Sequence, residues 1–119
     1  MSNYGLSIKW QPETQRVVAA ATLAASPGVY LGVGTAISNP ARQFLIWNLT
    51  DVVLQFSLDG INDHFPLPSN GYFVDDISSN TSISQNFLLG QGSRLYVKTM
   101  GTSPTLGSVY FTVFYGSNA

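Results

Sequence analysis

The stretch Val52-Val53-Leu54-Gln55-Phe56-Ser57-Leu58 carries apolar side chains at every second position. Successive side chains of a β-strand point to opposite faces, so this period of two predicts a strand over 52–58 with one fully apolar face. Asp59-Gly60 follows directly and is typical of a tight turn, because Gly tolerates a positive φ and Asp hydrogen-bonds its own backbone. The stretch therefore predicts a strand that ends at a turn, which is the unit of an antiparallel sheet.

Strand patterns of the same kind occur on both sides of this stretch. Thr50-Asp51 before it suits a hairpin to a preceding strand over 42–49, in which apolar groups occupy both faces, as in a strand covered on each side. Asn70-Gly71 predicts another turn. The further predicted strands are 64–67, 72–77, 82–89, 94–100 and 108–115. Short strands at near-regular spacing predict an all-β fold, an antiparallel β-sandwich or jelly roll. The aromatic residues expected in its core are Phe44, Trp47, Phe56 and Phe111.

The first thirty residues follow a different pattern, with prolines and no clean alternation. We expect residues 1–30 to form an N-terminal arm or interface segment and residues 31–119 to form the sandwich. Within the arm, 1–15 is extended and 16–25 is a strand, paired either with a neighbouring subunit or within the same sandwich. The residues expected at an interface are Tyr4, Trp10, Arg16 and Tyr30.

Charge is scarce in this chain. Charged residues make up only 9% of the sequence, and the net charge is −1, so polarity comes mainly from Ser, Thr, Asn and Gln. A free monomer usually needs more charge to stay apart from its copies, which favours a surface covered by partners, although an ordinary β-sandwich has a similar composition. The five cations are scattered and form no basic stripe, so we expect no nucleic-acid binding.

No targeting or membrane segment is expected. The opening residues lack the basic and apolar regions of a signal peptide. The most apolar run, 17–25, is too short to span a bilayer of roughly 30 Å. We therefore expect synthesis in a cytoplasm and no membrane partner.

The sequence offers little for catalysis or metal binding. It has one histidine and no cysteine, which excludes disulfides and thiolate metal sites. The loop from Asp59 to Asp63 spaces three oxygen-bearing side chains as a calcium site would, but these residues are also what ordinary turns use. His64 is expected to be a packed surface residue, because no G-x-S-x-G nucleophile motif accompanies it. We expect no enzyme, no catalytic residue, no cofactor and no metal. Asn48-Leu49-Thr50 matches a glycosylation pattern by accident.

The region from Gly34 to Gly116 resembles small structural proteins encoded among the head genes of tailed bacteriophages. The matching pattern has no catalytic signature. The segments that carry the resemblance are Asn39-Pro40-Ala41-Arg42, Ile46-Trp47-Asn48-Leu49-Thr50-Asp51, Phe56-Ser57-Leu58-Asp59-Gly60, Asn62-Asp63-His64-Phe65, Leu67-Pro68, Gly71, Ser79-Asn80, Gly92-Ser93-Arg94-Leu95-Tyr96-Val97-Lys98, Gly107-Ser108-Val109-Tyr110 and Phe114-Tyr115-Gly116.

The resemblance implies a capsid cement or decoration protein located in the virion. Such a protein binds junctions between subunits of the major capsid protein and often forms dimers or trimers with itself. The alternative is a tail, collar or head-fibre component whose β-sandwich binds carbohydrate for host recognition. That alternative predicts exposed aromatic side chains near the loops 59–64 and 101–107, where sugars could stack.

Overall fold

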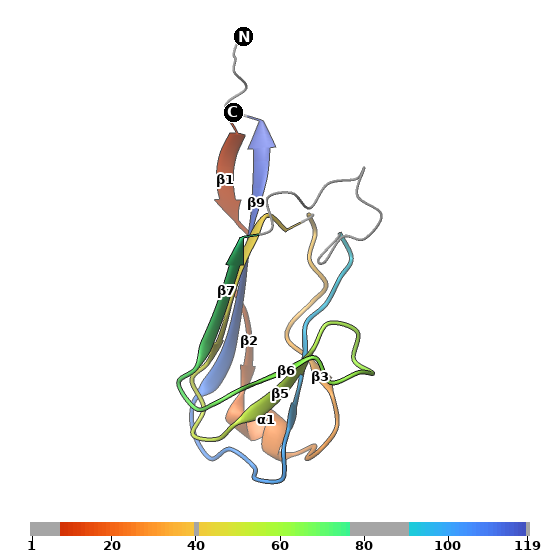
Figure 1. Ribbon diagram of the computed structural model, residues 1–119, viewed down its shortest axis with the longest axis vertical. Coiled ribbons are helices and arrows are strands. Elements are labelled where there is room, and N and C mark those ends of the chain that lie inside the picture. The colour runs from red at the N-terminus through yellow and green to blue at the C-terminus, as the bar shows by residue number, and fades with distance from the viewer. Residues whose placement is uncertain (1–7, 40, 77–90, 119) are drawn as a thin grey trace.

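The computed structural model describes the chain over residues 8–39, 41–76 and 91–118. These residues form two antiparallel sheets packed face to face, which confirms the predicted all-β sandwich (Figure 1). The jelly-roll connectivity stays a prediction, and the strand predicted over 82–89 lies outside the described residues. The elements are β1 (Ile8–Pro12), β2 (Arg16–Ala19), α1 (Ala20–Ala24), β3 (Leu31–Gly32), β4 (Gln43–Asn48), β5 (Leu54–Ser57), β6 (Phe65–Leu67), β7 (Tyr72–Asp76), β8 (Tyr96–Thr99) and β9 (Ser108–Asn118).

Sheet A is organised around β9. One edge of β9 pairs with β4, and β7 pairs with the other edge of β4. The opposite edge of β9 pairs with β2 near its start and with β1 near its end. Because the pairing of β4 with β9 stops at Gln43 and Phe114, the end of β9 continues with β1 as a two-stranded ribbon beyond the rest of the sheet (Figure 1).

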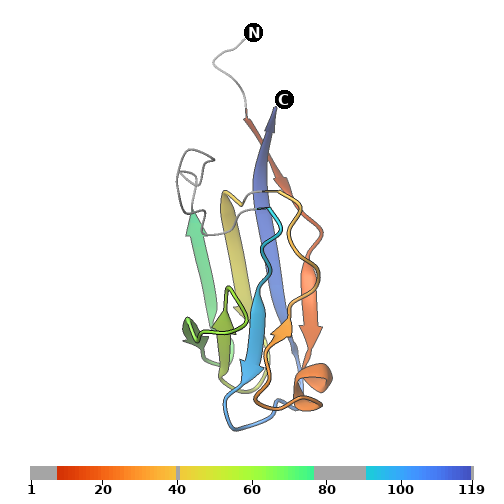
Figure 2. The same cartoon turned by 90° about the vertical axis from the view of Figure 1, so that its right-hand side faces the viewer.

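Sheet B has the order β3-β8-β5-β6 and lies in front of sheet A in Figure 2. Strands β5 and β6 form a hairpin, with Phe56 opposite Phe65. The predicted turn at Asp59-Gly60 lies in its loop, and Gly60 has a φ of 77°, the left-handed value that favours glycine. Both edge strands of sheet B are short, and β6 carries Pro66, which has no N–H to donate to a further strand.

The core lies between the two sheets. The predicted core residues Phe44, Phe56 and Phe111 are buried, and the rings of Phe44 and Phe111 meet edge to face at 6.4 Å. Aliphatic side chains from both sheets surround them. Alternation explains this on β4 and β9, since Phe44, Ile46, Phe111 and their every-second neighbours all point inward. The buried aliphatic members of the core are Val18, Leu23, Val33, Ile37, Ala41, Ile46, Leu54, Leu67, Leu95, Val97, Val109 and Val113.

The predicted hairpin at Thr50-Asp51 is wrong. Strands β4 and β5 belong to different sheets, so residues 49–53 cross between the layers, and residues 68–71 do the same between β6 and β7. Asn48 is fully buried beside both crossings. Its side-chain nitrogen donates to the backbone oxygens of Val52, Leu67 and Pro68, and its side-chain oxygen accepts from the N–H and hydroxyl of Thr50. A buried amide whose groups are all bonded holds both crossings in place.

The described part of the N-terminal segment belongs to the sandwich. Of the two alternatives for 16–25, the structure shows the strand within the same chain, because β2 pairs with β9. The strand is shorter than predicted, since residues 20–24 form the helix α1, where a strand was predicted. Val18 and Leu23 lie in the same core as Phe44. The described residues 8–24 thus pair with β9 or pack in the same core, while the division at residue 30 stays a prediction.

Candidate protein-binding surface

The outer face of sheet A, the side turned away from sheet B, is apolar and exposed. Its residues follow from the register, because residues opposite one another in antiparallel strands share a face. Trp47 lies opposite both Tyr72 and Tyr110, and Leu45 lies opposite Val74. Among the described residues, Asp76, opposite Gln43 at the end of β7, is the only charged residue that the register places on this face. The described members of the outer face of sheet A are Pro12, Val17, Ala19, Gln43, Leu45, Trp47, Tyr72, Val74, Asp76, Ser108, Tyr110, Thr112 and Phe114.

The most exposed part of this face lies over β4 and β7. Tyr72 is 64% exposed, Val74 50% and Trp47 39%, which are high values for large apolar side chains. The rings of Trp47 and Tyr72 meet edge to face at 6.3 Å. With Leu45 and Val74 they line a shallow depression of about 200 Å³. Trp47 was expected in the core, and its exposure corrects that prediction.

A signal for this face was present in the sequence. The strand over 42–49 carries apolar groups on both sides, which indicates a strand covered on both faces. In the structure sheet B covers Phe44 and Ile46, while Leu45 and Trp47 point to the opposite side. The sequence does not indicate which of the two faces of this strand is covered by the same chain. The exposed Trp47 could therefore not be distinguished from its buried neighbours Phe44 and Ile46.

Arg16, one of the expected interface residues, is buried and bonded within the chain. Its guanidinium is 8% exposed and bonds the carboxylate of Glu13 at 2.8 Å. It also donates to the backbone oxygens of Thr14, Thr35 and Ala36. Glu13 in turn accepts from the backbone N–H groups of Ser38 and Asn39. This cluster joins the bend between β1 and β2 to the loop that precedes β4.

The electrostatics of Glu13 follow from these contacts. Burial by itself raises the pKa of the carboxyl, but hydrogen bonds from Ser38, Asn39 and Arg16 outweigh it, and the net pKa is lowered. Glu13 is therefore ionised and paired at neutral pH. The ion pair stabilises the position of the N-terminal strands rather than offering a charge to a partner.

Tyr30, another expected interface residue, is held against the outer side of sheet B. Its hydroxyl donates to Asp63 at 2.5 Å, and the ammonium of Lys98 lies over its ring at 4.6 Å while bonding Asp63 at 3.0 Å. Burial and the hydrogen bond to Asp63 raise the pKa of Tyr30. Of the two remaining expected residues, Tyr4 lies outside the described residues. The backbone of Trp10 pairs with Gly116 in the ribbon.

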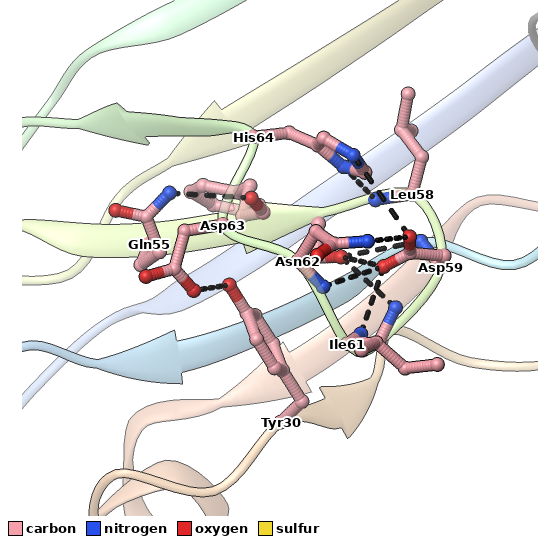
Figure 3. Close-up of polar contacts among 11 residues, drawn as sticks. Tyr30, Gln55, Leu58, Asp59, Ile61, Asn62, Asp63 and His64 are labelled. Carbon is pink, nitrogen blue, oxygen red and sulfur yellow. Dashed lines mark hydrogen bonds and ion pairs between the residues drawn. The ribbon is translucent and has the colours of Figure 1, made fainter.

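The loop 59–64, drawn in Figure 3, is organised by its own hydrogen bonds. The carboxylate of Asp59 accepts from the N–H groups of Ile61 and Asn62, from the Asn62 side chain and from Ser57. These bonds lower the pKa of Asp59 strongly. The side chain of Asp63 is directed to Tyr30 instead (Figure 3). It also bonds the ammonium of Lys98. The two aspartates that the sequence placed in a calcium-like pattern thus serve different partners.

His64 also takes part in the turn. Its Nδ1 accepts from the N–H of Leu58 at 2.9 Å, and its Nε2 lies 4.0 Å from Asp59. The hydroxyl of the fully buried Ser57 donates to Asp59 and not to His64. A nucleophile needs its base within hydrogen-bond reach, and here each group is used by the loop itself. The arrangement is that of a structural turn.

Aromatic faces near this loop are covered by other groups. Lys98 lies over Tyr30, the guanidinium of Arg94 lies 5.8 Å from the centre of the Tyr96 ring, and Gly60 packs against that ring. The loop 101–107 exposes Leu106 rather than an aromatic side chain. The carbohydrate alternative predicts exposed aromatic rings near these two loops. The rings near the loop 59–64 are instead covered by other groups, and the loop 101–107 presents an aliphatic side chain.

Neither a metal-binding cluster nor a membrane-spanning helix occurs among the described residues. Among the described residues, no group of three His, Asp or Glu side chains comes together as a metal site would require. Within the same residues, no helix has the length and hydropathy to cross a membrane.

Comparison of the chain with family models, with curated proteins and with solved structures finds no match.

Proposed function

We propose that this chain is a non-enzymatic structural protein of a tailed-bacteriophage virion, a cement or decoration protein that binds the major capsid protein and its own copies. The observation that carries the proposal is the exposed, largely apolar outer face of sheet A. The exposed side chains of Trp47, Tyr72 and Val74 belong to a single continuous part of it. Contiguous apolar patches on soluble proteins commonly mark protein–protein contacts.

The chemistry of the rest of the described chain supports the same function. Its polar side chains bond one another: Glu13 bonds Arg16, Asp59 holds its own loop, and Asp63 holds Tyr30 and Lys98. A cement protein needs a rigid body and neutral contact areas rather than a reactive cluster. Many copies bound to one shell gain avidity from effective concentration, so no single contact has to be strong.

The test is binding to empty shells assembled from the major capsid protein of the same phage. We expect the full chain to co-sediment with shells at a saturable ratio and to raise the temperature at which the shells break. Intact shells that retain no chain at about 100 µM, above the micromolar affinities typical of transient contacts, would contradict the proposal. A glycan array distinguishes the head-fibre alternative, which requires carbohydrate binding and no shell stabilisation.

The ribbon of β1 and β9 offers a second variant for this test. Deleting residues 1–12 removes β1 but keeps Glu13, so the ion pair with Arg16 survives. An isolated two-stranded ribbon is only marginally stable in water, which favours a partner that contacts it in the assembly. We expect the deletion to weaken shell binding while the thermal unfolding of the sandwich remains cooperative. Unchanged affinity for the shell would exclude the ribbon from the contact.

A further inference from the structure

We infer that the partner on the outer face of sheet A is a second copy of this chain, bound face to face. This inference rests on the proposed function only in that both require a protein to cover this face. It goes further by naming which of the two proposed partners does so.

Strand β4 is apolar on both faces. Phe44 and Ile46 are buried against sheet B, while Leu45 and Trp47 project to the outer face. Tyr72 and Val74 on β7 extend this apolar outer surface. Strands with two apolar faces belong to sheets that are covered on both sides. Within one chain, sheet B covers only the inner face of sheet A.

The shape of sheet A also favours a second copy. Two twisted sheets of the same hand stack with their strands about 30° apart and their mean planes about 10 Å apart. Sheet A already packs against a sheet on its inner side, where Phe44 and Phe111 share one core with Phe56 and Val97 of sheet B. A second copy presents a sheet of identical twist, so the outer faces of sheet A on the two copies are complementary in shape.

The outer face carries little charge. Its described side chains are apolar or neutral, and Asp76, opposite Gln43 at the end of β7, is the only charged residue that the register adds to it among the described residues. The ion pairs lie elsewhere: Glu13 with Arg16 at the N-terminal bend, and Asp63 with Lys98 on sheet B. Two copies that meet through the middle of the face, around Leu45 and Trp47, therefore bring no like charges into opposition there, and opposed like charges would disfavour self-association.

The area of the face indicates the size class of the contact. Four strands spaced about 4.8 Å apart and six residues long, at about 3.3 Å each, cover roughly 400 Å². A standard interface buries about 800 Å² per partner, so this contact belongs to the small, reversible class. We expect a dimer with a dissociation constant on the order of 10 µM. Copies held close together on a shell reach millimolar effective concentrations, where such a dimer is fully formed.

Sedimentation velocity of the full chain from 1 to 200 µM tests the inference without shells. Val74→Lys places an ammonium in the contact, and a two-fold contact contains the substitution twice, so we expect dissociation to rise about 100-fold or more. Ile61→Lys is the matched control, because Ile61 is 81% exposed on the loop between β5 and β6. It should leave the dimer unchanged. A wild-type chain that stays monomeric at 200 µM, or a dimer that tolerates Val74→Lys, overturns the inference.

A pair of variants identifies the second copy as the occupant. Leu45 lies between Val74 and Thr112 near the middle of the face. Leu45→Lys and Leu45→Glu should each be monomeric at 50 µM, and mixing them should restore a dimer, because only a copy-to-copy contact pairs the two charges. Circular dichroism shows whether each variant is folded. If either variant is unfolded, the sensitivity of the dimer to Val74→Lys is the test instead. A mixture of folded variants that remains monomeric contradicts face-to-face pairing.

The two proposals fail separately. A dimer sensitive to Val74→Lys that does not bind shells keeps the inference and removes the capsid function. Shell binding by a chain that remains monomeric keeps the capsid function and removes the inference.

Discussion

The side-chain amide of Asn48 donates to the backbone oxygen of Leu67 at 3.0 Å, so a residue at the end of sheet A holds the end of a strand in sheet B. The same amide reaches Val52 on the other crossing between the sheets. One buried side chain thus fixes the positions of both connections. The first prediction follows from this relationship.

Replacing Asn48 by Leu should destabilise the fold by about 3 kcal/mol, because buried backbone oxygens lose their donor and the Thr50 hydroxyl loses its acceptor. Urea unfolding followed by circular dichroism measures the change. Ser103→Ala on an exposed loop serves as the control and should stay within about 0.5 kcal/mol of the wild type. A loss below about 1 kcal/mol would show that water replaces the Asn48 amide.

Gly107 and Gly101 form a matched pair for backbone strain. Both have a positive φ, 89° and 97°, but a Cβ at Gly107 would overlap the Leu49 carbonyl, whereas a Cβ at Gly101 would meet open space. Gly101→Ala should cost about 1 kcal/mol for the left-handed conformation alone. Gly107→Ala should cost at least about 2 kcal/mol more, since the crossing after β4 has to move. Equal losses of unfolding free energy would contradict the close approach of Gly107 to Leu49.

Glu13 predicts a dependence of stability on pH. Its folded-state pKa is lowered from an unfolded value near 4.5, so its contribution is complete above that value and is lost as pH falls through the folded pKa. Glu13→Gln should lower stability at pH 7 by about 2 kcal/mol, because Arg16 loses a charged partner but keeps backbone acceptors. Melting temperatures from pH 7 to pH 3 should therefore converge for wild type and variant. A constant gap down to pH 3 would mean that the carboxylate is not responsible.

Tyr30→Phe tests the contact between Tyr30 and the loop 59–64. The change removes the hydroxyl that donates to Asp63 but keeps the ring beneath Lys98. Amide hydrogen exchange at Asn62 and Asp63 should become roughly threefold faster, as expected for the loss of one partly exposed hydrogen bond. Exchange in β9, which does not contact this loop in the sheet pairing, provides the internal control. If hydrogen exchange in the loop is unchanged, the hydrogen bonds to Asp59 alone hold the loop in place.

Much of the fold could be predicted from local patterns. The alternation over 52–58 and 108–115 locates β5 and β9, because a strand with one covered face has a period of two. The crossing at Thr50-Asp51 could not be separated from a hairpin. A turn signal says that the chain bends there, but which sheet the next strand joins depends on distant partners.

The binding surface was harder to predict, for a related reason. Trp47 and Phe44 lie on the same strand, and their exposure differs because sheet B covers only one side of it. Arg16 was expected at an interface, yet Glu13 and three backbone oxygens bury it. Neither outcome is encoded in local spacing, since both depend on which segments pack together in three dimensions.

The position of β9 in sheet A also determines the order in which the protein is able to fold. β9 follows β1, β2 and β4 along the chain, yet it is the strand that all three pair with. During synthesis these earlier strands leave the ribosome without their common neighbour, and their pairing with β9 waits for residues 108–118, although β4 can pair with β7 before then. Contacts of such long sequence separation slow folding. Chaperones that shield exposed strands on the nascent chain would therefore act mainly before β9 emerges.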